Sequence, residues 1–284
     1  MNKIKNRKYS DFIKKLPLRF FLIVLLFTMV FPLLWTFMSS VKTNAEYMID
    51  PFGLPNGFHW ENYAEAIKTT NMFSAIKNSL YVVVVSLIVL LLCAIPCSYV
   101  LVRYRTRFIR SLNALIICCL FINSSYIIIP LFLEMRVFKL LNNLTALGVL
   151  YATFSLPYSI FLLTGYMQEI PRDYEEAAIL DGCSPLQVLI HIVVPLSKAI
   201  ILTVSMIAIL SAWGEYVVAL VVVTDPLKQT FPVSLAKLYE VAKFATNWGA
   251  LFASLSVALI PTLVLFLIGE KYAVKGMTVG GLKG

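Results

Sequence analysis

Charged side chains are scarce in this sequence. Only 14% of its 284 residues are Asp, Glu, Lys or Arg, and 60% are hydrophobic, whereas about a quarter of the residues in a soluble domain are charged. So few charges cannot cover a water-exposed surface, which excludes an ordinary soluble protein. The formal charge of +9 is divided among short basic clusters between apolar runs. This pattern indicates membrane topology and argues against nucleic-acid binding.

Cysteine and ligand-forming motifs are equally sparse. None of the five cysteines falls in a predicted outer loop, so no disulfide framework is expected. Cys93 and Cys97 share a helix face, yet no His or second Cys pair completes a set of four metal ligands. Packing between helices is the simpler interpretation of both. The sequence also lacks a Gly-x-x-x-x-Gly-Lys-Ser/Thr phosphate loop. It therefore predicts no metal, no cofactor and no enzymatic activity in this chain.

Long apolar runs are abundant instead, each near the ~20 residues that a helix needs to cross ~30 Å of hydrocarbon. Only helices and closed barrels satisfy the backbone in lipid, and these runs lack the alternation of barrel strands. We therefore predict an all-α membrane protein with six transmembrane helices, in which prolines such as Pro130 kink the helices. The runs are Leu18–Met38, Leu80–Val102, Leu112–Leu133, Ala146–Met167, Ala199–Val223 and Leu251–Ile268.

The basic residues predict the orientation of these helices. With the N-terminus inside, sixteen of the 24 Lys and Arg fall in cytoplasmic segments, which favours both termini in the cytoplasm. We expect a cytoplasmic N-terminal segment at 1–17, a transmembrane domain at 18–270 and a cytoplasmic tail at 271–284. The first outer segment, about Val41–Lys77, is too polar to span and is expected to lie over the outer face.

The longest predicted cytoplasmic loop, about 170–198, is the most informative stretch. Three acidic residues follow Pro171, which places negative charge where a helix dipole favours it. We predict a helix from about Pro171 to Leu180, ended at Asp181 by Gly182 in a left-handed conformation. The following Ser184-Pro185-Leu186-Gln187 has the spacing of a capping box and predicts the start of a second helix.

The first of these helices is slim, because Ala177 and Ala178 leave little surface, while Tyr174, Ile179 and Leu180 supply apolar contact. Such a helix can enter a groove on another protein. The alternative is a helix pair that lies on the inner leaflet, although surface helices usually carry more Lys and Arg.

The stretch Glu176-Ala177-Ala178-Ile179-Leu180-Asp181-Gly182, followed after nine residues by Ile192-Val193-Val194-Pro195, resembles the EAA loop of permease subunits of bacterial ATP-binding-cassette importers. The resemblance implies the permease fold of type I importers, in which this loop is a coupling helix that docks into a cleft on an ATPase subunit. It implies that role for Glu176, Ala177, Ala178, Asp181 and Gly182. ATP is then hydrolysed by a separate subunit.

Further stretches resemble the carbohydrate branch of this family, the class that contains the smaller maltose permease subunit. They are Pro32-Leu33-Leu34-Trp35, Ser39-Ser40-Val41-Lys42, Asn62-Tyr63, Trp213-Gly214-Glu215-Tyr216 and the tail from Gly276 to Gly284. Sugar permeases usually have Asn where this chain has Gly214. The resemblance implies a sugar or oligosaccharide as the transported solute.

Two polar stretches inside the predicted spans are candidates for a substrate path. Glu215 is the only acidic residue deep in a predicted span, and an unpaired charge in lipid is unfavourable, so it is expected to face the protein interior. It is either a pathway or gate residue or a partner in a structural hydrogen bond. Trp213 and Tyr216 suit stacking on a sugar ring or ordinary packing. A second polar stretch consists of Asn123, Ser124, Ser125 and Tyr126. These residues either contact the substrate or form hydrogen bonds between helices.

We therefore expect a multi-pass protein of the bacterial cytoplasmic membrane that works by alternating access. Its expected partners are a second homologous permease subunit, two ATPase subunits, an extracellular or periplasmic solute-binding protein, the sugar and membrane lipid. The alternatives are an importer for another solute, such as amino acids or phosphate, an ion-coupled secondary carrier, and a membrane scaffold. One intramembrane Glu is thin support for a carrier, and a scaffold gives no reason for the coupling loop.

Overall fold

The computed structural model describes residues 16–122, 124–245 and 247–280, and every regular element in these ranges is helical. The first half contains α2 (Leu16–Ser40), α3 (Asn44–Ile49), α4 (Glu61–Thr70), α5 (Met72–Arg103), α6 (Arg107–Cys119), the short 3-10 helix η1 (Ser124–Ile127) and α7 (Ile128–Val137). The second half contains α8 (Leu144–Gln168), α9 (Asp173–Leu180), α10 (Pro185–Val188), the π-helical turn η2 (Leu189–Val193), α11 (Val194–Leu196), α12 (Lys198–Gly214), α13 (Val217–Val222), α14 (Phe231–Ala245) and α15 (Trp248–Gly280). An all-α architecture is confirmed for the described residues.

The chain divides into two compact units. Of the described residues, the first unit comprises 16–69, 238–245 and 247–257, and the second comprises 70–122, 124–237 and 258–280. The second unit contains α5 to α13, and therefore the loop and the polar stretches that the sequence singles out.

In the first unit, Trp35 near the end of α2 organises the polar segment that follows. Its ring stacks on Phe52 at a centroid distance of 5.5 Å and meets Phe252 edge-on at 5.1 Å. Its Nε1 donates a 2.8 Å hydrogen bond to the carbonyl oxygen of Pro51. The same carbonyl accepts a bond from the amine of Lys42, a side chain that is only 1% exposed. The segment after the first apolar run is thus tied back to the end of α2.

Asn62 on α4 closes the same unit. Its amide nitrogen donates to the carbonyl oxygens of Ser40 and Lys42 at 2.9 and 2.8 Å. The hydroxyls of Tyr63 and Ser40 are 2.8 Å apart and share a hydrogen bond. A Cβ at Gly249 would lie 2.6 Å from the Asn62 amide, so only glycine lets α15 approach this closely. Three of the stretches that resemble sugar permeases meet here: Pro32–Trp35, Ser39–Lys42 and Asn62–Tyr63.

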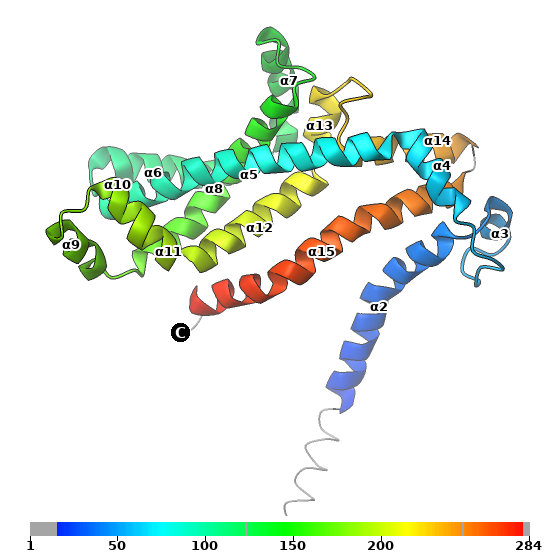
Figure 1. The fold of residues 1–284 in the computed structure, drawn as a ribbon, viewed down its shortest axis with the longest axis horizontal. Coiled ribbons are helices and arrows are strands. Elements are labelled where there is room, and N and C mark those ends of the chain that lie inside the picture. Colours follow the sequence, from blue (N-terminus) through cyan, green and yellow to red (C-terminus); the bar gives the residue numbers. More distant parts are fainter. Residues whose placement is uncertain (1–15, 123, 246, 281–284) are drawn as a thin grey trace, which may run out of the picture. The chain divides into compact units, whose positions relative to one another are not determined.

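In the second unit, α5, α8 and α12 run side by side and form the centre of the fold (Figure 1). Gly148 permits the close approach of α5 and α8, because a Cβ there would lie 2.8 Å from a methyl carbon of Val85 and 3.1 Å from the carbonyl oxygen of Val82. Small residues at such crossings let helices in a membrane gain packing energy, since burial of apolar surface contributes little there.

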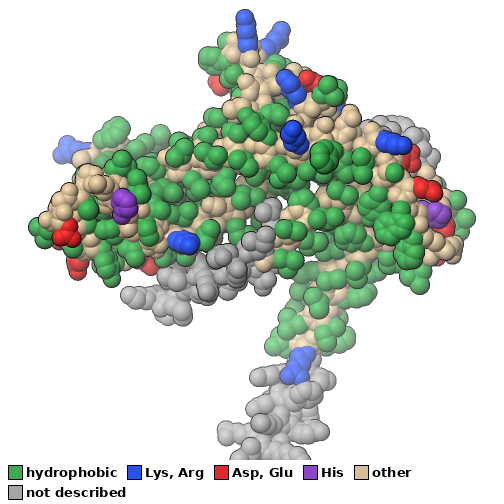
Figure 2. Space-filling model, in the orientation of Figure 1, with side chains coloured by type: hydrophobic (Ala, Val, Ile, Leu, Met, Phe, Trp, Pro, Cys, Tyr) green, Lys and Arg blue, Asp and Glu red, His purple; other side chains and the backbone are tan. Residues whose placement is uncertain are grey.

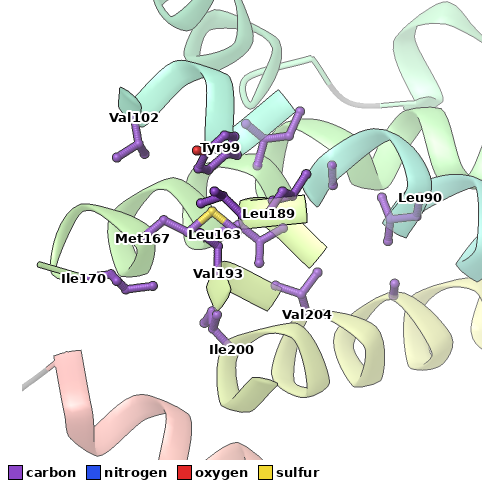
Figure 3. Packing of buried hydrophobic residues seen from close by; sticks show 14 of the residues in the cluster. Leu90, Tyr99, Val102, Leu163, Met167, Ile170, Leu189, Val193, Ile200 and Val204 are labelled. Carbon is purple, nitrogen blue, oxygen red and sulfur yellow. The ribbon is translucent and has the colours of Figure 1, made fainter. Parts of the chain in front are cut away.

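One hydrophobic cluster joins these three helices to the short elements that follow α8 (Figure 3). Leu163 and Met167 of α8 lie among Tyr99 of α5 and Leu189 and Val193 of η2. The cluster also includes residues of α9, α10 and α12. The short elements are therefore held by packing to the long helices, not suspended as a free loop.

Three of the six predicted spans are continuous apolar helices. Among the described residues, Pro17–Ser40, Met72–Arg103 and Leu144–Gln168 are long and apolar enough to cross a membrane, which confirms the first, second and fourth runs as helices. Pro185–Leu196 and Lys198–Gly214 pass the same test only together, and they are bent by 79° at their junction. The sixth run lies in α15, which continues to Gly280. The count of six spans stays a prediction.

The third run is not one helix, so the prediction of a continuous span from Leu112 to Leu133 is wrong in its middle. α6 ends at Cys119 and α7 begins at Ile128, with η1 between them. Pro130 supplies the physical reason. It has no N–H and its ring clashes with the carbonyl four residues earlier, so it fits the first turn of a new helix better than the interior of a long one.

Candidate functional site

α9 ends in the way that its sequence predicts. The φ angle of Gly182 is +86°, in the left-handed region. The N–H of Gly182 donates to the carbonyl of Ile179 at 3.0 Å, and the N–H of Cys183 donates to the carbonyl of Ala178 at 2.9 Å. These two bonds make a Schellman motif. The observed helix starts at Asp173, two residues later than predicted, and its end is confirmed.

The second helix also begins as predicted. Ser184 Oγ accepts a 3.4 Å hydrogen bond from the N–H of Gln187, and Gln187 Oε1 accepts a 2.8 Å bond from the N–H of Ser184. This reciprocal pair is a capping box. The helix then widens into η2, where the N–H of Val194 donates to the carbonyl of Leu189, five residues earlier. Pro195 comes next and has no N–H to continue a regular ladder, which favours a π-helical turn at this place.

The outer face of α9 mixes charge with apolar surface. Glu176, Ala177 and Asp181 are exposed, as is Gly182. Leu180 is 89% exposed, and the neighbouring Tyr174 and Ile179 are exposed as well. Figure 2 shows acidic side chains beside hydrophobic ones at the end of the second unit that carries α9. A surface of this kind suits a protein partner, because an exposed apolar patch gains by burial and the acidic residues give the contact a charge preference.

Ala178 lies on the opposite face of α9. It is 6% exposed and belongs to the hydrophobic cluster with residues of α5, α8 and η2. The sequence groups it with Ala177 on an outer surface, whereas the structure places it inward, where a small side chain allows α9 to lie against the bundle.

Glu175 also points inward and holds α9 to the end of α5. Arg103, the last residue of α5, forms an ion pair with it, and Arg103 Nε donates a 2.7 Å hydrogen bond to Glu175 Oε1. The hydroxyl of Tyr99 donates a 3.0 Å bond to Glu175 Oε2. Both charged side chains are less than one tenth exposed. This pair is not among the predictions from the sequence, where its only signal is a second Glu beside Glu176 and an Arg at the end of an apolar run.

Glu215 lies where the fifth predicted span is interrupted. α12 ends at Gly214 and α13 begins at Val217, so the prediction of one helix over Ala199–Val223 is wrong at this point. The physical reason is the Glu215 carboxylate, which takes over the N–H groups at the start of α13: Oε1 accepts from Val218 at 2.8 Å and Oε2 from Ala219 at 3.1 Å.

The other candidate path residues are distributed around the same end of the unit. Trp213 is buried and stacks on Phe231 at 6.3 Å between ring centroids, while Tyr216 is half-buried. Tyr126 in η1 is 83% exposed, and η1 contacts α13. Asn123 lies outside the described residues, and the side chain of Ser124 is likewise not described.

A cavity of about 560 Å³ lies elsewhere, between α6, α8 and α12. Its walls include Asn113, Tyr158, Thr164, Gly165 and Thr203. None of the predicted path residues lines it.

No group of three or more His, Cys, Asp or Glu is arranged to hold a metal ion in the parts of the chain that the structure describes. Cys93 is exposed and Cys97 is half-buried on α5, and both are free thiols. The sites at α9 and at Glu215 are built from hydrogen bonds and packing.

Comparisons with known proteins identify relatives over nearly the whole chain. The binding-protein-dependent transport system inner membrane component family matches residues 91–276. The sulfoquinovosyl glycerol transport system permease protein SmoH of Agrobacterium fabrum is 34% identical over 277 residues, which cover 97% of this chain and 96% of SmoH. The diacetylchitobiose uptake system permease protein DasC of Streptomyces coelicolor is 30% identical over 92% of this chain and 95% of DasC.

A solved structure shares the fold. It is the crystal structure of a bacterial ABC transporter involved in the import of the acidic polysaccharide alginate. One of its chains matches this one with a TM-score of 0.80 and 24% identity, covering 93% of this chain and 97% of that chain.

Proposed function

Because this chain belongs to the family of binding-protein-dependent transport system inner membrane components, we propose that it is the permease subunit of an ATP-binding-cassette importer for a sugar or oligosaccharide. It carries the solute through the cytoplasmic membrane, and separate ATPase subunits supply the energy. The alternatives, an importer for another solute and an ion-coupled carrier, have no specific observation in their favour.

The geometry of α9 is the observation that carries this proposal. The helix is closed at Gly182 by a Schellman motif and is fixed at the end of the bundle by its inner face. Its outer face presents Glu176, Ala177 and Leu180 to a partner. We propose that this face docks into a cleft on an ATPase subunit, with Glu176 meeting a basic side chain there. Asp181 and Gly182 keep the turn in shape, and Ala178 sets the distance between α9 and the bundle.

In this arrangement α9 lies on the cytoplasmic side, and both chain termini lie on the same side. The basic residues between α5 and α6, from Arg103 to Arg110, support this orientation, because positively charged loops remain in the cytoplasm. A second homologous permease subunit completes the path, a pair of ATPase subunits binds below, and a solute-binding protein delivers solute from outside.

Transport then proceeds by alternating access. ATP binding draws the ATPase subunits together and displaces α9, which is joined along the chain to α12 through α10, η2 and α11. The helix along the proposed path is broken at Glu215, where α12 ends and α13 begins. Trp213 and Tyr216 flank this break. Broken helices of this kind place polar groups at membrane depth inside transporters.

The solute class rests on the relatives. SmoH and DasC are named for sulfoquinovosyl glycerol and diacetylchitobiose. Both are glycosides that carry many hydroxyl groups. We propose that this chain transports a solute of the same chemical class.

The direct test is to purify the tagged chain in mild detergent from its own cells and to identify the subunits that copurify. We expect an ATPase subunit, a second permease subunit and bound glycan. Abundant, monodisperse protein that brings down no ATPase would contradict the proposal.

A further inference from the structure

The contact between α9 and α5 includes a pair of charged side chains that are largely buried. Arg103 and Glu175 are 9% and 8% exposed, so both charges have given up most of their hydration. A buried ion pair adds little net stability compared with well-packed apolar residues, because desolvation offsets the attraction. Stability alone is therefore a poor explanation for this pair.

The pair does fix a position very closely. The Arg103 guanidinium makes two contacts at once: Nε and Nη2 engage Glu175 on α9, and Nη2 also donates a 3.2 Å hydrogen bond to the carbonyl of Ile170 in the connection between α8 and α9. Tyr99, one turn earlier on α5, holds the second carboxylate oxygen of Glu175. A planar guanidinium with several donors is well suited to such a contact, since it defines direction as well as distance.

Besides the packing of Ala178 in the hydrophobic cluster, two connections run from α9 into the bundle. One is covalent and leads through Gly182, α10 and η2 to α12. The other is the contact of Glu175 with Arg103 and Tyr99, which leads to α5, and α5 packs along both α8 and α12. The packing of Ala178 also holds α9 to the bundle, but apolar packing is non-directional, so the contact with Glu175 is the one that fixes the orientation of α9 relative to α5.

We propose that Glu175, Arg103 and Tyr99 form an anchor that makes α5 follow α9, so that displacement of α9 by the ATPase moves the α5–α8–α12 bundle as one body. The three are positioning residues, distinct from the docking residues on the outer face of α9. The proposal rests on the proposed function, and it assigns a role to residues that touch neither ATP nor solute.

The test is the amount of solute taken up per ATP hydrolysed, measured with the complete complex in proteoliposomes. Three solutes are first tried with the unsubstituted complex: diacetylchitobiose, sulfoquinovosyl glycerol and maltose. The solute that this complex accumulates is then used for all variants. A variant that merely folds poorly lowers uptake and hydrolysis together and leaves their ratio constant. Loss of the anchor lowers uptake more than hydrolysis.

For Glu175→Gln we expect the ratio to fall about fivefold, within the range for coupling between sites. Tyr99→Phe removes a single hydrogen bond and should lower the ratio in the same direction by a smaller factor. The double variant Arg103→Glu with Glu175→Arg should recover part of the loss. Asp173→Asn is the matched control, because it removes one negative charge from the same helix at an exposed position.

A ratio for Glu175→Gln equal to that of Asp173→Asn would overturn the anchor. So would a double variant with a ratio no higher than that of Glu175→Gln. Failure of the unsubstituted complex to couple hydrolysis to uptake is a different result, and it would contradict the proposed function itself.

Discussion

The hydroxyl of Tyr151 on α8 donates a 2.7 Å hydrogen bond to Glu215 Oε2, at the point where α12 ends and α13 begins. Together with the N–H groups of Val218 and Ala219, it gives the carboxylate three hydrogen bonds. Both oxygens of the carboxylate thus have partners within this chain. The sequence leaves two roles open for Glu215. This geometry favours the structural role, in which the residue stabilises the break between α12 and α13.

Substitution of Glu215 should therefore act on stability first. Glu215→Leu loses all three bonds, and hydrogen bonds to charged groups contribute ~1.5–3 kcal/mol each, so a large drop in melting temperature is expected. Glu215→Gln keeps one acceptor oxygen and should lose less, and Tyr151→Phe should lose least. Thermal unfolding of the purified protein in detergent ranks the three. Equal melting temperatures and normal transport for Glu215→Leu and Glu215→Gln would show that the hydrogen bonds have no such role.

The effect of a substitution at Gly182 should depend on how readily the new residue adopts a positive φ, and not on the size of its side chain. No atom lies within 4 Å of a Cβ built at this position, so the penalty of Gly182→Val comes from its positive φ. That penalty is ~1–3 kcal/mol, and Asn, which enters the left-handed region more readily, should have a smaller one. We expect Gly182→Val to weaken ATPase association and Gly182→Asn largely to retain it, as judged by copurification.

Gly165→Ala is the control for Gly182, because its Cβ position is equally open and its backbone is helical. It should copurify ATPase at the normal level. If Gly182→Val behaves like Gly165→Ala at equal abundance, the turn after α9 does not position the docking surface.

Reversal of charge at Glu176 tests docking directly. Glu176→Lys should reduce ATPase copurification and uptake while membrane insertion persists, because the residue is exposed and lies outside the apolar helices. Glu134→Lys, on the exposed surface of α7, is the control for the added charge. A helix that only lay on anionic lipid would bind more strongly with the extra Lys. Stronger membrane contact with normal uptake would therefore support the lipid-surface alternative.

Topology can be read from single cysteines in a variant that lacks the five native ones. Cysteines at Asn56 and Phe138, both exposed, should react with an impermeant reagent in intact cells, and one at Arg105 should not. Asn142 is a poor choice, since its Oδ1 accepts hydrogen bonds from the N–H groups of Thr224 and Asp225. Labelling of Arg105→Cys from outside would contradict the predicted orientation.

Local chemistry made the turn after α9 predictable. A glycine that ends a helix and a Ser-Pro-x-Gln start each act within a few residues, so Gly182 and the pair of Ser184 and Gln187 adopt the expected geometry. The long apolar runs at α2, α5 and α8 are predictable for the same reason, because composition over ~20 residues decides them.

Contacts between distant residues were not predictable in this way. Arg103 and Glu175 are 72 positions apart. Their contact shows which face of α9 points inward, and Ala178 lies on that same face. The breaks in the third and fifth runs differ from this case, because Pro130 and most bonds of Glu215 act within one turn of the chain. A proline in a long apolar run is also compatible with a kinked helix, and the bond from Tyr151 to Glu215 joins residues 64 positions apart. Apolar composition gives no sign of such breaks, since the residues on both sides of each remain hydrophobic.

Uptake into proteoliposomes that contain the purified complex tests the central claim most directly. With ATP enclosed in the vesicles, and with the solute-binding protein and labelled sugar outside, we predict accumulation that needs the ATPase subunits and is lost in Glu176→Lys. A proton or sodium gradient without ATP should give none. Accumulation driven by an ion gradient alone, at the same rate with and without ATP, would contradict the account.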